Sequence, residues 1–188
     1  MKKYYLYVVL TRTNTVVSKL IHFVSKDDYT HAVLALDKDL TYMYSFSRRY
    51  THNPFIGRFR RENFSEGVYN FQKVLPGVVI ELEVSKEQYD TAISLLNNFI
   101  KSPNIYKYNY KGLLNSWLSR ERCYENRFLC SEFVYYILNA SGIADFNISR
   151  NLVKPQNLLN LNGKVIFKGD LKEYAHPALV SNNVRKII

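Results

Sequence analysis

The stretch FLCSEFVYYILNA, residues 128–140, decides the fold of this chain. Its apolar side chains recur at the spacing of one helical face, at Cys130, Phe133, Val134, Ile137 and Leu138. Gly142 follows at a position where a helix commonly ends. The pattern predicts a helix that begins near Cys130 and packs one face on a core, with the thiol in its first turn.

Around this helix the chain alternates between strand-like runs and turns. Strands are expected over residues 3–11, 29–36, 41–46, 68–74, 78–84 and 164–168, and residues 48–67 are expected to form a long loop. Further helices are expected over residues 16–24, from a capping box at Ser85 and Gln88 up to Pro103, and shortly after Pro155. The mixture predicts an α+β fold, with residues 1–188 as one domain.

Composition limits the classes of function. Hydrophobic residues make up 47% of the 188-residue chain, as in ordinary globular proteins, and a net charge of +10 favours anionic partners. No nucleic-acid-binding motif accompanies this charge, so nucleic acid is not the expected partner. No apolar run reaches the roughly 18 residues of a membrane-spanning helix, and the first apolar run suits a strand better than a signal peptide. We therefore expect a cytoplasmic protein.

Cys130 is the candidate nucleophile. A helix start presents unpaired N–H groups and the positive end of the helix dipole, which favour thiolate over thiol and can hold an oxyanion. The alternative is a small buried side chain, since free cysteine is often buried. Cys123 shares none of these features, and the spacing of the two cysteines fits neither a disulfide framework nor a zinc site.

His31 is the candidate base for this thiol. It begins a strongly apolar run, where a buried imidazole needs a polar reason to be present. A cysteine nucleophile needs a histidine close in space rather than in sequence. The alternative is a core histidine satisfied by its own hydrogen bonds.

The segment after residue 48 is rich in arginine and aromatic residues. Arg58, Arg60 and Arg61 could bind a phosphate or carboxylate on a substrate. The alternative is a solvated loop with scattered charge.

Two segments resemble a known family. Residues 29–33 (YTHAV) and 128–134 (FLCSEFV), with Tyr108-Asn109-Tyr110 between them, resemble the YiiX-like, circularly permuted branch of the NlpC-type papain-like cysteine hydrolases of bacteria. The resemblance covers roughly residues 4–160. It implies a permuted papain-like fold, in which an antiparallel sheet that carries the histidine packs against the cysteine helix. It also implies Cys130 as nucleophile, His31 as base and Tyr108 as a tyrosine that lines the site and assists the oxyanion.

The third catalytic position departs from the family pattern. The family places a polar residue, often glutamate, on the strand after the histidine, whereas here that region reads YMYSF, residues 42–46, and Ser45 is the nearest match. A hydroxyl would orient the imidazole but stabilise its cation less than a carboxylate.

The resemblance predicts an enzyme. Cys130 and His31 would cleave an amide, ester or thioester through an acyl-enzyme, by hydrolysis or acyl transfer, on a peptide, cell-wall peptide or lipid-linked substrate, without metal or organic cofactor. The alternative is a non-catalytic binding module that uses the same groove for an anionic ligand, which the missing carboxylate favours.

Overall fold

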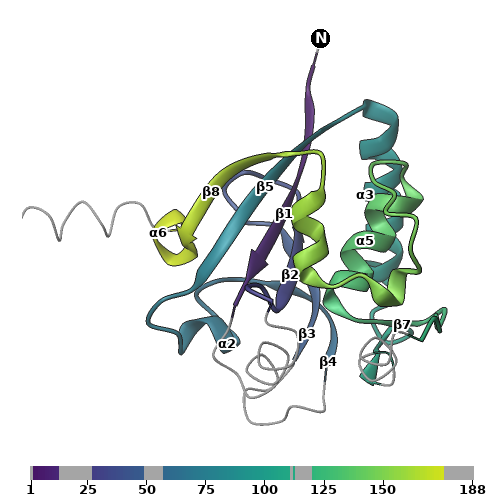
Figure 1. The fold of residues 1–188 in the computed structure, drawn as a ribbon, viewed down its shortest axis with the longest axis horizontal. Helices are drawn as coiled ribbons and strands as arrows, with labels where there is room; N and C mark the ends of the chain where they lie inside the picture. Colours follow the sequence, from purple (N-terminus) through teal and green to yellow (C-terminus); the bar gives the residue numbers. More distant parts are fainter. Residues whose placement is uncertain (1, 13–26, 49–56, 111, 113–119, 176–188) are drawn as a thin grey trace, which may run out of the picture.

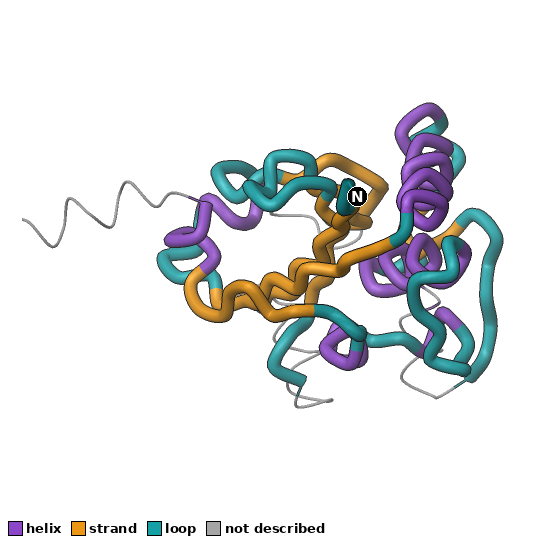
Figure 2. The backbone as a smooth tube through the Cα atoms, turned by 90° about the horizontal axis from the view of Figure 1, so that it is seen from above, coloured by secondary structure: helices purple, strands orange, loops and turns teal. Residues whose placement is uncertain are grey.

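The computed structural model describes residues 2–12, 27–48, 57–110, 112 and 120–175. Within them, eight strands form one sheet in the order β7-β6-β4-β3-β2-β1-β5-β8. The strands are β1 (Tyr4–Thr11), β2 (His31–Ala35), β3 (Met43–Arg48), β4 (Gly57–Glu62), β5 (Pro76–Val84), β6 (Lys107–Tyr108), β7 (Arg127–Phe128) and β8 (Lys164–Asp170). Neighbouring strands are antiparallel except β6 and β7, which are parallel. The α+β prediction is confirmed, and the sheet curls strongly (Figure 2).

The helices are α2 (Gly67–Asn70), α3 (Lys86–Lys101), α5 (Cys130–Ala140) and α6 (Leu171–Ala175), with 3-10 helices η1 (Arg150–Leu152) and η2 (Pro155–Asn160). The two long helices, α3 and α5, lie on one side of the sheet (Figure 1), whereas Tyr69 of α2 and Leu171 of α6 belong to an apolar cluster on the opposite face. The α3 helix begins at the capping box that the sequence predicts, since Ser85 accepts from the backbone N–H of Gln88. None of the described helices is long and apolar enough to cross a membrane.

The central strand β1 is buried on both faces. Leu6, Val8 and Leu10 point into the main core beneath α3 and α5, while Tyr7 and Val9 point into a second cluster on the opposite face. Burial on both faces explains why β1 reads as a continuous apolar run rather than as an alternating one.

The α5 helix is the main cover of the sheet. It packs against β2 and β3, and its buried side chains include Phe133, Val134, Ile137 and Leu138. Phe46 of β3 packs edge or tilted against four aromatic rings, those of Phe59, Phe99, Phe128 and Phe133. This packing fixes the start of α5 over the strands that carry the candidate site.

Most sequence-predicted elements are present, and two predictions are wrong. Residues 48–67, expected as a loop, contain strand β4, whose single inward apolar side chain, Phe59, gives too weak an alternation to reveal it. Residues 68–74, expected as a strand, begin inside α2, whose first residue, Gly67, has φ 58. The helix expected at residues 16–24 lies outside the described residues.

Replacing Phe46 with alanine should lower the free energy of unfolding by about 3–5 kcal/mol, because a buried aromatic ring leaves a cavity. Phe71, which is 72% exposed, is the matched control, and Phe71→Ala should change it by less than about 0.5 kcal/mol. Urea unfolding of both variants measures the difference. Similar losses in the two variants would contradict the packing described here.

Candidate active site

Cys130 is the first residue of α5 and is 8% exposed. The preceding residue, Leu129, is extended, and its N–H donates to the carboxylate of Glu132 at 2.9 Å. The chain therefore enters the helix from a strand-like segment and turns sharply at the thiol. An α-helix leaves the N–H groups of its first turn without partners inside the helix, so the start of α5 offers donors for an oxyanion at the residue that carries the thiol.

His31 is the first residue of β2, and its backbone pairs with Thr11 of β1. Its ring Nε2 lies 3.2 Å from both carboxylate oxygens of Glu62. The side chains of His31 and Glu62 are only 15% and 3% exposed. Their contact is therefore a largely buried ion pair when the ring is protonated.

Two neighbours act on the His31 ring. Burial is the largest single influence and lowers the pKa of His31, but the negative charge of Glu62 and the charge and hydrogen bond of the Cys130 sulfur together outweigh it and raise the pKa to about 10. The ring therefore carries a proton at neutral pH. The structure thus brings together the two residues that the sequence pairs, Cys130 and His31.

Glu62 ends strand β4, opposite Met43 of β3. Its carboxylate accepts hydrogen bonds from His31, from the hydroxyl of Tyr69 on α2 and from the hydroxyl of Ser47. Burial alone would raise the pKa of Glu62, but the charge of His31 and these three donors lower it. Glu62 is therefore held as a carboxylate.

Tyr69 completes this chain of contacts. Its ring lies 6.4 Å from the His31 ring and meets Phe64 edge to face. Burial and the charge of Glu62 raise the pKa of Tyr69 well above its ordinary value, so its hydroxyl keeps the proton that it donates to Glu62. The short α2 helix exists in a region that the sequence assigns to a strand, and it aims Tyr69 at the carboxylate.

Ser45 does not occupy the orienting position that the sequence suggests. Its buried hydroxyl donates to the backbone carbonyl of Ala32 at 2.7 Å. The carboxylate that contacts His31 comes instead from Glu62, one strand further along the sheet. If residues 57–62 are read as a strand, alternation puts Phe59 on one face and Glu62 on the other, together with Arg58 and Arg60.

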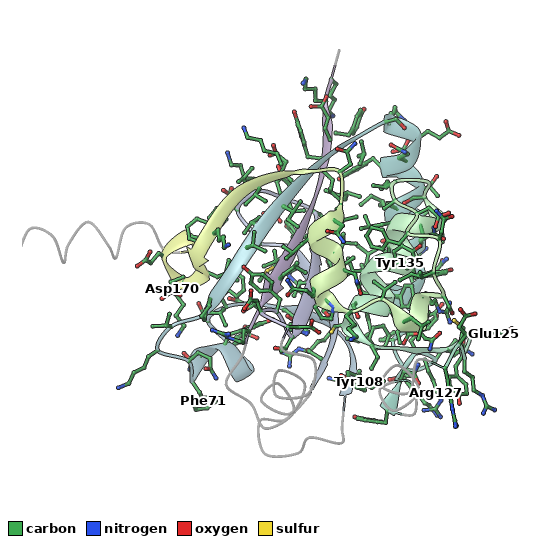
Figure 3. The ribbon with its side chains drawn as sticks, viewed as in Figure 1. Phe71, Tyr108, Glu125, Arg127, Tyr135 and Asp170 are labelled. Carbon is green, nitrogen blue, oxygen red and sulfur yellow. The ribbon has the colours of Figure 1, made fainter. Side chains whose placement is uncertain are left out.

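Tyr108 lies next to the segment that leads into Cys130. The parallel pairing of β6 with β7 sets Tyr108 beside Phe128, two residues before the thiol. The centroids of the Tyr108 and Tyr110 rings are 4.8 Å apart. Gly57 lies so close to the Tyr108 side chain that any Cβ at position 57 would clash with it. Figure 3 shows Tyr108 at the same corner of the molecule as Arg127.

A buried polar network ties this corner to α5. One oxygen of Glu132 accepts from the amide of Asn109 at 3.0 Å as well as from the Leu129 N–H, and Arg150 lies 3.8 Å from the other oxygen. Burial is the main influence on Glu132 and raises its pKa. The network joins the residue after Tyr108 to the helix start that carries Cys130.

The three arginines predicted to bind an anion do not share one face. Alternation along β4 puts Arg58 and Arg60 on the face of Glu62 and Arg61 on the other face. The guanidinium of Arg61 donates to the Thr41 carbonyl and lies 4.6 Å from the Tyr42 ring. Arg61 is thus held away from the candidate site.

Comparison with known proteins adds no assignment: no protein-family profile, no curated protein and no solved structure matches this chain. Among the described residues, no three histidine, cysteine or acidic side chains gather as metal ligands would. The chemistry of the site must therefore be argued from the Cys130–His31–Glu62 geometry.

Replacing Glu62 with glutamine should lower the pKa of His31 from about 10, because the carboxylate that stabilises the imidazolium is lost. The histidine ring signals in an NMR titration measure this pKa. Glu83→Gln, which changes an exposed carboxylate bound to Lys3, is the control and should leave it unchanged. An unshifted His31 titration in Glu62→Gln would contradict the ion pair.

The same pair should make stability depend on pH. Because the pKa of His31 is raised above 6.5 in the folded state, its contribution is complete below that pH and is lost as pH rises through about 10. Because the pKa of Glu62 is lowered below 4.5, its contribution is complete above that pH and is lost in acid. The stability gap between the wild type and Glu62→Gln should therefore be widest between pH 4.5 and 6.5.

Replacing Tyr69 with phenylalanine should raise the pKa of Glu62, because one of the donors that stabilise its carboxylate is removed. The free energy of unfolding should fall by about 1.5–3 kcal/mol, as for a lost hydrogen bond to a charged group. Tyr7→Phe is the matched control, since Tyr7 donates to Glu81 away from the site. Carboxyl NMR shifts and urea unfolding read the two effects, and equal behaviour of the two variants would refute the role of Tyr69.

Proposed function

We propose that this chain is a cysteine hydrolase or acyltransferase that cleaves an amide, ester or thioester bond. Cys130 is its nucleophile, His31 its acid and base, and Glu62 the residue that orients the imidazole. The observation that carries the proposal is the His31 ring, which contacts the Glu62 carboxylate through Nε2 and interacts with the sulfur of Cys130. Nucleophile, base and orienting group in series are the arrangement that this chemistry requires.

The charges in the site suggest the order of proton transfers. With His31 protonated, the sulfur of Cys130 attacks the carbonyl carbon as a thiolate, and the carbonyl electron pair moves to its oxygen. The N–H groups at the start of α5 stabilise that oxyanion. When the intermediate collapses, the bond to the leaving group breaks, His31 protonates that group, and an acyl-thioester on Cys130 remains.

The second half of the reaction reverses the roles. Neutral His31 takes a proton from water or from an acceptor alcohol or amine, whose oxygen or nitrogen attacks the thioester. Cys130 leaves as a thiolate and His31 is again a cation beside Glu62. Hydrolysis and acyl transfer differ only in the acceptor, so both belong to the proposal.

The arrangement of elements supports a permuted papain-like fold of the YiiX-like kind. The strand that carries the histidine, β2, precedes the cysteine helix, α5, and the helix packs directly on that strand. The acid on a following strand matches the family pattern better through Glu62 than through Ser45. By the same resemblance, Tyr108 lines the site, and the substrate is a peptide, a cell-wall peptide or a lipid-linked acyl compound.

The rival function is a binding module without catalysis, which the absence of a carboxylate from residues 42–46 favours. The contact between His31 and the Glu62 carboxylate supports the catalytic proposal instead. Reactivity of the thiol separates the two functions directly.

Under the proposal, iodoacetamide near neutral pH should label Cys130 about tenfold or more faster than Cys123, since an ordinary thiol is only a few per cent thiolate at that pH. His31→Ala should remove most of the difference because the cation beside the sulfur is lost. Peptide mass spectrometry after a short pulse reads both cysteines in one sample, with Cys130→Ser confirming the site. Slow labelling of Cys130 that becomes fast only on unfolding would identify a core thiol and overturn the proposal.

A further inference from the structure

Three cationic side chains lie directly opposite one another on adjacent strands. Arg58 of β4 pairs with Lys107 of β6, and Lys107 pairs with Arg127 of β7. We call Arg58, Lys107 and Arg127 the cationic row. Arg127 lies at the corner of the molecule beside Tyr108 (Figure 3).

The row faces the same side of the sheet as the polar part of the candidate site. Phe59 and Phe128, the neighbours of Arg58 and Arg127, point into the main core, so the two arginines point away from it. Arg58 also pairs with Ser47 of β3, whose hydroxyl donates a hydrogen bond to Glu62. The cationic row therefore runs from β4, the strand of Glu62, toward the β7 edge of the sheet, on the same face as the His31–Glu62 pair.

This arrangement costs stability unless an anion is bound. Like charges directly opposite on antiparallel strands, as Arg58 and Lys107 are, destabilise the folded state. Among the described residues, no ion pair joins any member of the row to a carboxylate, whereas Lys3 and Lys86 each have an acidic partner. Lys107 and Arg58 are exposed, so both remain accessible to a ligand.

We propose that the cationic row binds a phosphate group of the acyl substrate, an inference that rests on the function proposed above. Phosphate offers up to two charges and several acceptor oxygens, which suit two guanidinium groups and an ammonium better than a single carboxylate does. The ligand chemistry is a phosphate ester, carried either by a lipid headgroup or by a soluble compound.

The test measures binding of two probes to the full chain. Calorimetry with inorganic pyrophosphate represents the soluble source, and co-sedimentation with phosphatidylcholine vesicles, with and without phosphatidic acid, represents the lipid source. Lys107→Gln combined with Arg127→Gln should weaken binding of whichever probe the wild type binds by about tenfold or more, the effect of losing charge-assisted hydrogen bonds worth 1.4 kcal/mol or more.

The matched control removes the same charge from the opposite edge of the sheet. Lys164→Gln combined with Lys168→Gln changes two exposed lysines of β8 and should leave binding unchanged. Equal weakening by both double variants, or no binding of either probe by the wild type, would overturn the proposal. Tighter binding of a single-stranded RNA than of either probe, lost in the first double variant, would also overturn it in favour of nucleic acid.

The two proposals can fail separately. Iodoacetamide labelling reports on Cys130 and does not depend on the cationic row, and probe binding does not need the thiol. Cys130→Ser should therefore bind the phosphate probe as the wild type does. Selective binding by the row together with an inert Cys130 would refute catalysis alone.

Discussion

The buried ion pair between His31 and Glu62 is the contact on which the rest of this site depends. Removing two charges from water is costly, and a buried pair is tolerated only when its remaining hydrogen-bonding capacity is satisfied. Here Tyr69 and Ser47 donate to the carboxylate, and the sulfur of Cys130 faces the ring. Each of these neighbours comes from a different element, so the pair specifies how β2, β3, β4, α2 and α5 meet.

The curled sheet makes this meeting possible. Glu62 lies two strands from His31 in the sheet order, yet curvature of the sheet brings its carboxylate to within 3.2 Å of the ring. The apolar face of the same sheet packs beneath α5 through Phe46 and its aromatic neighbours. The packed aromatic face therefore holds α5 in place on the sheet, and the start of β2 carries His31, the candidate base.

The helix start and the strand residue could be predicted from the sequence because each has a local cause. Cys130 opens an amphipathic run, and His31 opens an apolar strand, so both stand out within a few residues. The orienting group could not be found in this way. Glu62 is an acid among arginines in a segment without a clear period, and its burial results from a strand pairing between distant residues. Ser45 is the nearest match to the family pattern on the strand that follows His31, but its hydroxyl donates to the backbone carbonyl of Ala32.

Surface charge shows the same limit. The sequence groups Arg58, Arg60 and Arg61 because they are adjacent, whereas strand alternation separates Arg61 from the others. Strand register instead joins Arg58 to Lys107 and Arg127, which are far apart in the chain. Pairings of this kind depend on how two-residue strands dock, which no local pattern reveals.

The most direct measurement of the central claim is a double-mutant cycle on the rate at which iodoacetamide alkylates Cys130. The four proteins are the wild type, Glu62→Gln, His31→Ala and the combination of the two. If Glu62 acts on the thiol through the imidazole, Glu62→Gln slows alkylation in the wild-type background and has no effect once His31 is alanine. Equal effects of Glu62→Gln in both backgrounds would show that the carboxylate acts independently of His31, and would contradict the account.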